Sequence, residues 1–370
     1  MVTSEQVMKT LEGVNDPELG GNVVELGMIT DVRIEDAHVE IGLALTVAEC
    51  PLRNQIENDT RRRVAAMPGV DTVEIRTTAM TKRQRAELMS VARRRIRENA
   101  EPTQVRSTTR VVAVASGKGG VGKSSVSVNL AAAMAQAGHR VGILDADIWG
   151  FSVPRMLGVT GRLEADPETK LIRPLTAHGV KVISTGLIIE SEETALMWRG
   201  LMLSKALEQF LKQVEWGDLD YLIIDMPPGT GDVQMALTRL LPQAEMVVVT
   251  TPQSAAQKVA MRVADMARRS HMPVIGVVEN MSGEVFGTGG GEELATEIGA
   301  PYLGSIPLDR GVVTGGDQGV PVVLTDQPGP AAEALRSIAK TLVAALPPVE
   351  METCTGRIAK LIADLENGAA

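Results

Sequence analysis

The segment that most constrains the fold is a glycine-rich run between a predicted strand and a predicted helix. Residues 116–125 read Ser-Gly-Lys-Gly-Gly-Val-Gly-Lys-Ser-Ser and fit the pattern G-x-x-x-x-G-K-[ST]. An apolar run, 111–115, precedes it, and a helical pattern, 126–137, follows it. Its four glycines let the backbone curl so that successive N–H groups face one point, and the start of the following helix adds positive charge. The run therefore predicts a phosphate-binding loop.

Short apolar runs alternate with helical patterns from Arg110 onward. Runs of this kind are typical of strands buried on both faces, in a parallel sheet between helices. We therefore expect a doubly wound, mostly parallel α/β domain of the P-loop NTPase class. The interval 159–189 interrupts the alternation, and we expect a hairpin insertion there. The expected strands are Val111–Ala115, Val141–Leu144, Tyr221–Ile224, Met246–Val249 and Val274–Val278.

The first hundred residues follow a different pattern, which predicts a small α+β domain in front of the larger one. Alternating apolar positions at 29–34 and 39–43 indicate strands, and helical patterns surround them. An arginine-rich helical pattern over 81–98 leads into a polar stretch typical of a linker. The expected divisions are 1–98 (small domain), 99–109 (linker), 110–347 (P-loop ATPase domain) and 348–370 (C-terminal helical tail).

Composition excludes several classes of protein. The chain has 37 Lys and Arg against 46 Asp and Glu, a net charge of −9, and only eight aromatic residues. An acidic chain with little material for base stacking is not expected to bind nucleic acid, and we expect the Arg61–Arg63 and Arg93–Arg95 runs to be solvated helix faces. No apolar run reaches the roughly 18 residues that cross a bilayer, and the first residues do not resemble a signal peptide. With two widely separated cysteines, a cytoplasmic protein without a membrane partner is expected.

The loop also predicts the chemistry of the site. Lys123 is expected to neutralise charge on the β- and γ-phosphates of ATP, and the Ser124 hydroxyl to bind Mg²⁺. Two acidic positions follow predicted strands, where ligands gather in open α/β sheets. Asp225 is expected to hold the Mg²⁺ shell, and Asp147 to position the attacking water. The remaining expected nucleotide-binding residues are Gly117, Gly119, Gly120, Val121, Gly122 and Ser125.

Lys118, a second lysine inside the loop, is the most discriminating residue. With it the loop resembles the deviant-Walker-A ATPases, which include nitrogenase iron protein, MinD and ParA. The resemblance implies that Lys118 reaches across a nucleotide-sandwich dimer to the partner's phosphates. The active form would then be a homodimer, with Lys118 a catalytic residue beside Lys123.

The segments beyond the loop look like the Mrp/ApbC family of iron–sulfur cluster carrier ATPases over about residues 108–345. This resemblance implies an ATP-hydrolysing carrier that delivers clusters to apoproteins or takes them from scaffold proteins. It also implies that Asn280 and Pro307 lie near the adenine; from its chemistry alone, Asn280 could equally be a turn residue. The segments that carry the resemblance are Leu144–Pro154, Trp198–Gly200, Ile224–Asp232, Thr250–Gln253 and Val278–Met281.

The front domain resembles the SufT-like iron–sulfur assembly domain, on residues 16–19, 24–29 and Cys50-Pro51. In that family the cysteine is the functional thiol, so Cys50 is the candidate iron–sulfur ligand; an inert buried cysteine is the alternative. The Mrp/ApbC pattern usually has a Cys-x-x-Cys after the Asn-Met pair, whereas residues 282–291 of this chain contain no thiol. Four-thiolate ligation at that place is excluded. A transient cluster, glutathione-assisted ligation or a scaffold-held cluster all stay open.

We therefore expect a homodimeric Mg²⁺-ATPase that carries iron–sulfur clusters. Two alternatives are kept open. One is a positioning ATPase like ParA or MinD. The other is a regulatory ATPase that has lost cluster binding, which the missing thiols favour.

Overall fold

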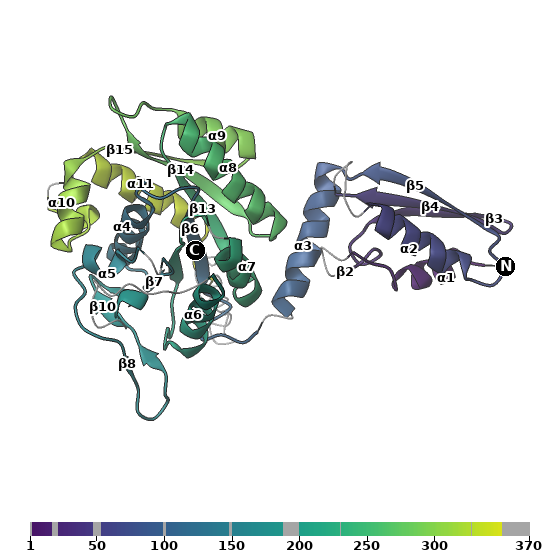
Figure 1. Cartoon of the computed structure of the whole chain (residues 1–370), viewed down its shortest axis with the longest axis horizontal. Helices are drawn as coiled ribbons and strands as arrows, with labels where there is room; N and C mark the ends of the chain where they lie inside the picture. Colours follow the sequence, from purple (N-terminus) through teal and green to yellow (C-terminus); the bar gives the residue numbers. More distant parts are fainter. Residues whose placement is uncertain are drawn as a thin grey trace, which may run out of the picture. The chain divides into compact units, whose positions relative to one another are not determined.

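The chain divides into two compact units, Met1–Ala100 and Glu101–Ala370. This computed structural model describes residues 2–16, 21–46, 53–98, 101–147, 150–187, 200–229, 231–326 and 328–349 (Figure 1). The division falls within the stretch 99–109 that the sequence analysis treats as a linker. Among the described residues, no helix is both long enough and apolar enough to cross a membrane.

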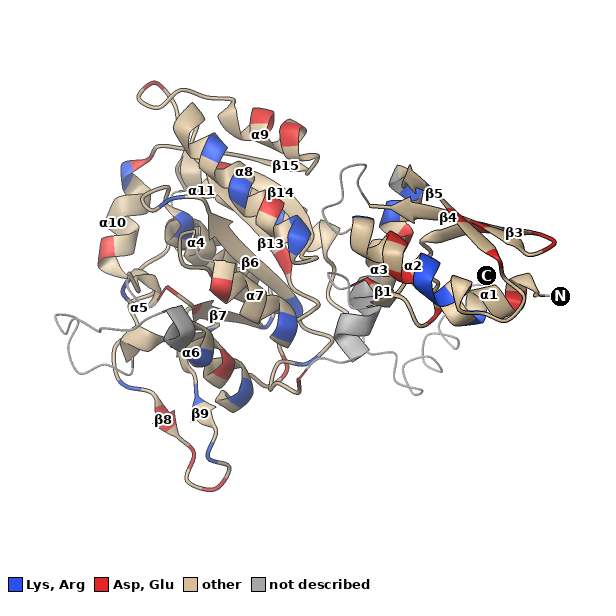
Figure 2. Ribbon diagram, turned by 45° about the vertical axis from the view of Figure 1, so that its right-hand side comes forward, with Lys and Arg blue, Asp and Glu red and all other residues tan. Residues whose placement is uncertain are grey.

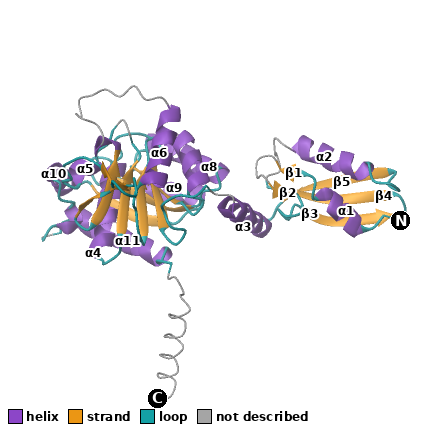
Figure 3. Ribbon diagram, turned by 90° about the horizontal axis from the view of Figure 1, so that it is seen from below, coloured by secondary structure: helices purple, strands orange, loops and turns teal. Residues whose placement is uncertain are grey.

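The first unit is built on a three-stranded sheet (Figure 3). Strands β3 and β4 pair antiparallel, whereas β4 and β5 pair parallel because helix α2 crosses over between them. Buried side chains such as Val7 of α1, Leu43 of β4 and Ile56 of α2 pack these two helices and the sheet into one core. This is the small α+β domain expected from the sequence. Its elements are α1 (Ser4–Leu11), β1 (Asn15–Asp16), β2 (Gly21–Asn22), β3 (Ile29–Glu35), β4 (His38–Leu45), α2 (Arg53–Ala65), β5 (Thr72–Ala79) and α3 (Lys82–Glu98).

The second unit contains an eight-stranded sheet of order β10-β11-β7-β12-β6-β13-β14-β15, in which only the edge strand β10 runs antiparallel. Its helices are α4 (Lys123–Gln136), α5 (Val153–Met156), α6 (Gly200–Gln213), α7 (Gly231–Leu240), α8 (Ser254–Arg269), α9 (Gly290–Ile298), α10 (Arg310–Gln318) and α11 (Pro330–Ala345), with 3-10 turns η1 (Thr185–Leu187) and η2 (Val322–Leu324). Its strands are β6 (Arg110–Ser116), β7 (Val141–Asp145), β8 (Glu164–Ala165), β9 (Ile172–Arg173), β10 (Leu175–Ala177), β11 (Val180–Ser184), β12 (Tyr221–Asp225), β13 (Glu245–Thr250), β14 (Val274–Ser282) and β15 (Tyr302–Pro307).

Helices cover both faces of this sheet (Figure 3). One core lies between the strands and helices α6, α7, α8 and α9, and the other between the strands and helices α4 and α11. The central strands are buried on both faces, which explains their almost purely apolar sequences. All five strands predicted from those runs are present, and the doubly wound, mostly parallel sheet is confirmed.

The interval 159–189 differs in part from the hairpin insertion that we predicted. Strands β8 and β9 do form a short antiparallel hairpin outside the main sheet. Strand β11, however, pairs parallel with β7 and belongs to the main sheet, with β10 added at its edge. Val180, Val182 and Ile183 of β11 are fully buried, so the apolar side chains of this strand complete the two cores beside β7.

Candidate functional site

The glycine-rich run forms a loop between β6 and the first residue of α4. Gly120 and Gly122 have φ values of +79° and +78°, a conformation that residues with a Cβ rarely adopt. Gly117 is required for a different reason, because a Cβ there would lie 2.4 Å from the carbonyl carbon of Val259 in α8. The loop thus packs against the backbone of α8. It leads directly into the N-terminus of α4, where the positive end of the helix dipole adds to the loop's N–H groups. This is the geometry of a phosphate-binding loop.

The structure brings Lys123, Ser124 and Asp225 together beneath the loop. The Lys123 ammonium lies 2.8 Å from Asp225 Oδ1, and the Ser124 hydroxyl donates to Asp225 Oδ2 at 2.6 Å. Asp225 is completely buried and the Lys123 side chain is 7% exposed. A buried carboxylate needs such partners, since an unpaired charge there would be costly.

A residue that the sequence analysis missed completes this cluster. The Ser127 hydroxyl donates to Asp225 Oδ1 at 2.6 Å and is fully buried. Ser127 lies one helical turn after Lys123, so both side chains are on the face of α4 that meets β12. A serine four residues after the loop lysine, between the apolar residues Val126 and Val128, is the signal that could have revealed it.

Asp145 is a second buried carboxylate that the sequence analysis gave no role. It ends β7, at the same register position as Asp225 on the neighbouring strand β12. Its Oδ2 accepts hydrogen bonds from the N–H groups of Ser152 and Val153 and from the Ser184 hydroxyl. Burial and then the charge of Asp225 raise the pKa of Asp145 to about 8, although nearby Lys123 acts in the opposite direction.

Asp147 and Lys118 are each close in sequence to a member of this cluster, Asp147 to Asp145 and Lys118 to Lys123. The N–H of Asp147 donates to Asp145 Oδ1 at 3.1 Å, and Asp147 Oδ1 accepts from the N–H of Gly150 at 3.2 Å. Asp147 is half-buried, and the Asp145 carboxylate accepts hydrogen bonds from the N–H groups of Asp147 and Val153. Lys118 is exposed, and its carbonyl oxygen accepts a hydrogen bond from the Ser116 hydroxyl.

Asn280 packs directly against the phosphate loop. Its side-chain amide donates to the carbonyl oxygen of Val121 at 2.9 Å, and a Cβ on Gly122 would lie only 2.2 Å from the same nitrogen. Asn280 lies on β14, and Pro307 ends the neighbouring β15, paired with Ser282. In this structure Asn280 therefore fixes the loop's shape, and the adenine contacts of Asn280 and Pro307 stay a prediction.

The segment after Asn280 and Met281, where the Mrp/ApbC resemblance implied a Cys-x-x-Cys, closes on itself. Gly283 and Gly287 exchange two backbone hydrogen bonds, of 2.9 and 2.7 Å, which leaves Val285 74% exposed near the tip. The buried Glu279 carboxylate then accepts from the N–H groups of Gly289 and Gly291 at the start of α9. Cys50 and Cys354 lie outside the described residues, and within the described part no group of His, Cys, Asp and Glu side chains is arranged to hold a metal ion.

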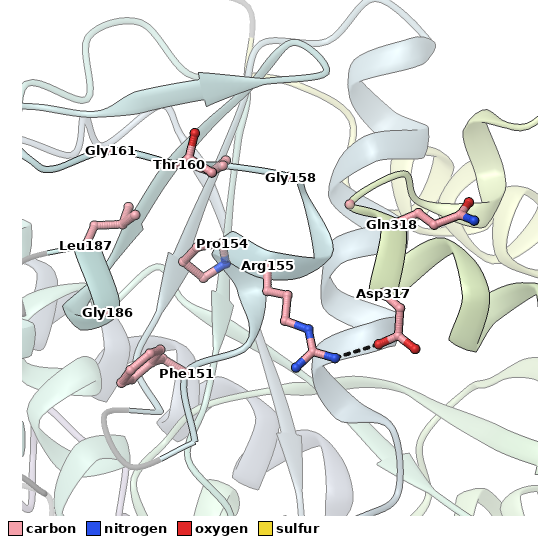
Figure 4. A pocket seen from close by; sticks show the side chains of 12 residues that line it. Phe151, Pro154, Arg155, Gly158, Thr160, Gly161, Gly186, Leu187, Asp317 and Gln318 are labelled. Carbon is pink, nitrogen blue, oxygen red and sulfur yellow. Dashed lines mark hydrogen bonds and ion pairs between the residues drawn. The ribbon is translucent and has the colours of Figure 1, made fainter. Parts of the chain in front are cut away.

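A separate cavity of about 450 Å³ lies next to the loop that contains Asp147 (Figure 4). Phe151 and Leu187 supply apolar lining, and Arg155 from α5 forms an ion pair of 2.6 Å with Asp317 from α10. Both charged side chains are mostly exposed. The ion pair links the ends of two helices beside the site.

The fold and the loop together define a P-loop NTPase. Residues 107–343 match the sequence family described as NUBPL iron-transfer P-loop NTPase, and residues 4–75 match the iron-sulfur cluster assembly protein family. The chain belongs to the family of iron-transfer P-loop NTPases, with an iron–sulfur assembly domain at its front. The resemblance on which the sequence analysis relied is confirmed.

Relatives are similar over nearly the whole chain. An "Iron-sulfur cluster carrier protein" of Synechocystis sp. is 42% identical over 356 residues, which cover 92% of this chain and 97% of that protein. The protein of the same name in Mycobacterium tuberculosis strain H37Rv is 46% identical over 353 residues, covering 91% and 92%. These names agree with the carrier role expected from the sequence.

Solved structures show the same fold for the second unit. A nucleotide-binding protein from Archaeoglobus fulgidus, determined in complex with ADP, is 33% identical, with a TM-score of 0.50 over 61% of this chain and 91% of that one. The cell division ATPase MinD of Pyrococcus furiosus has a TM-score of 0.51 at 22% identity, over 64% and 99% of the two chains, and supports the fold alone.

Proposed function

We propose that this protein is an ATP-hydrolysing iron–sulfur cluster carrier that works as a homodimer and delivers clusters to apoproteins. The observation that carries the ATPase half is the buried cluster of Lys123, Ser124 and Asp225 beneath the phosphate loop. The carrier half is supported by family membership and by the carrier proteins that match over more than nine-tenths of the chain.

The loop residues bind the triphosphate. The N–H groups from Gly117 to Ser125 face the phosphates, and Lys123 neutralises charge on the β- and γ-phosphates. Phosphate oxygens compete with Asp225 for the Lys123 ammonium, which lies 2.8 Å from that carboxylate. Lys118, exposed on the loop, reaches the phosphates of the second subunit and stabilises charge that develops in the transition state.

The same cluster has the donors that Mg²⁺ prefers. The Ser124 hydroxyl and the Asp225 carboxylate are hard oxygen ligands 2.6 Å apart, next to the phosphate loop. Ser124 would bind the ion directly and Asp225 through its water shell. When bound, Mg²⁺ neutralises negative charge on the phosphate oxygens.

Asp147 orients the attacking water. Asp145 holds the loop around it through hydrogen bonds at residues 147, 152 and 153, which fixes the approach of the Asp147 carboxylate. Asn280 and Pro307, at the ends of adjacent strands, form the adenine side of the site.

We assign ligation of the iron–sulfur cluster to Cys50, because the turn at 283–287 contains no cysteine. The test is anaerobic reconstitution of the full chain with ferrous iron and sulfide, followed by visible absorbance and transfer to an apo-ferredoxin. We expect a cluster that forms on the native chain and on Cys354→Ala, and that is lost in Cys50→Ala. An equal cluster on Cys50→Ala contradicts the assignment of the thiol.

The turn at 283–287 also favours a second function, that of a regulatory ATPase without cargo. The same reconstitution separates the two. ATP hydrolysis with no cluster and no transfer on any of the three chains would establish the regulatory ATPase and refute the carrier.

A further inference from the structure

Helix α8 contacts both the phosphate loop and the start of α7. Gly117 of the phosphate loop lies against the backbone of Val259, and Gly231, where α7 begins after the segment that follows Asp225, lies against Met266. A Cβ on Gly231 would be 2.8 Å from the Met266 sulfur. Any movement of either segment therefore changes its contact with α8.

Between these supports lies a cavity of about 270 Å³ with a mostly apolar lining. Val259, Val263 and Met266 of α8 form one side, and Gly117 and Pro227 form the opposite one. Two of the polar lining side chains are already hydrogen-bonded, the Gln234 amide to the Ser270 hydroxyl and the Ser116 hydroxyl to the Lys118 carbonyl oxygen. The cavity therefore suits an apolar side chain of about the size of leucine or methionine.

The outer rim of the cavity is basic. Arg262 and Met266 also line an adjoining groove of about 480 Å³, together with Lys258 and Arg269. Arg269 is paired with Asp265 at 3.0 Å, but no ion pair within the described residues involves Lys258 or Arg262. Helix α8 carries four basic residues and one acidic residue on a chain whose net charge is −9. Figure 2 shows the blue positions repeating along α8.

We propose that this cavity and groove dock an acidic segment of a partner protein, which inserts one leucine- or methionine-sized side chain beside Met266. Lys258 and Arg262 attract the acidic residues on either side of the inserted side chain. The apolar cavity favours an apolar inserted side chain. Nucleic acid would satisfy the charges but would leave the apolar cavity unfilled. The inference rests on the proposed function, since the docked segment would belong to a protein that gives or receives the cargo.

Docking here would be linked to the nucleotide. The phosphate loop and the segment after Asp225 form one wall of the cavity, so partner and nucleotide bias the same elements. If the nucleotide changes the affinity for the partner by some factor, thermodynamic linkage requires that the partner change the affinity for the nucleotide by the same factor.

The test measures fluorescence anisotropy of the full chain with a fluorescein-labelled peptide in which glutamate pairs alternate with leucine pairs. We expect the Lys258→Glu/Arg262→Glu variant to bind at least about tenfold more weakly, and Lys340→Glu on α11, an equally exposed position, to stay within about twofold. A peptide with serine in place of leucine should also bind at least about tenfold more weakly to the native chain. Affinities with ADP and with a non-hydrolysable ATP analogue should differ by at least about threefold.

Three results overturn the proposal: equal binding by the charge-reversed variant, equal binding of the serine peptide, or the same affinity with both nucleotides. Charge reversal that breaks a dimer in light scattering assigns the groove to a second copy, and loss of a bound DNA oligonucleotide instead of the peptide assigns it to nucleic acid. Calorimetry with ATP on the same samples distinguishes a failure of the docking site from a failure of the proposed function. Heat with ATP but no peptide binding refutes only the docking site, whereas no heat with ATP refutes the proposed function.

Discussion

Asp145 and Asp225 occupy the same register position on the neighbouring parallel strands β7 and β12, and both side chains are completely buried. Among the described residues, Asp225 has a cation at contact distance, the Lys123 ammonium at 2.8 Å, and Asp145 has none. Two buried carboxylates that share one cation compete for it, so one of them tends to keep its proton. Burial, together with the charge of Asp225, therefore raises the pKa of Asp145.

Stability should therefore depend on pH through Asp145. Burial and the charge of Asp225 raise its pKa from the ordinary 3.8 to about 8. Between these values the folded chain retains a proton that the unfolded chain has lost, so stability falls as pH rises through this window. In scanning calorimetry without nucleotide, the Tm should drop by several degrees from pH 5 to pH 8. Asp145→Asn should flatten that slope, and an unchanged slope would contradict the assignment.

Lys123→Ala should abolish ATP hydrolysis while the fold is retained. Removing the cation also leaves Asp225 buried and unpaired, which should lower the free energy of unfolding by about 3 to 5 kcal/mol. The matched control is Lys123→Ala/Asp225→Asn, which removes both charges. It should recover most of the stability in urea titrations and none of the hydrolysis; near-normal turnover in either variant would refute the role of Lys123.

Lys118→Ala should separate binding from hydrolysis. Lys118 is exposed and lies outside the buried cluster, so its removal should leave the fold and monomeric nucleotide binding intact. Hydrolysis should fail, because the partner's phosphates lose a charge-stabilising group. Calorimetry with ATP, phosphate release and light scattering test these points, and unchanged turnover would eliminate a role across a dimer.

Two glycines of the loop provide a matched pair. A Cβ at Gly117 would lie 2.4 Å from the Val259 carbonyl carbon, whereas a Cβ at Gly119 would meet nothing within 4 Å. Gly117→Ala should therefore cost about 1 to 3 kcal/mol of stability and weaken ATP binding, because the loop must move away from α8. Gly119→Ala should leave the stability unchanged. Equal effects in thermal melts would show that α8 does not constrain the loop.

Much of the site could be predicted because its chemistry depends on local patterns. Loop, strand and helix are contiguous in the sequence, and Asp225 follows a run whose burial on both faces was evident from its composition. Ser127, by contrast, donates a hydrogen bond to Asp225 only because α4 packs against β12. The two residues are 98 positions apart in the sequence. The inclusion of β11 in the main sheet likewise depends on long-range pairing with β7. The resemblance implied an adenine contact for Asn280, whereas its hydrogen bond to Val121 joins β14 to a loop 159 residues earlier and could not be read from local sequence.

The joint support that α8 gives to the phosphate loop and to the start of α7 limits how relatives of this chain can diverge. A substitution on the inner side of this helix changes its contacts with both segments at once, and we expect it to alter ATP binding. Selection can therefore remodel only its outward side freely, where Lys258 and Arg262 lie. Variation among relatives should concentrate on that outer side, and each lineage could then acquire new recipients without rebuilding its ATPase.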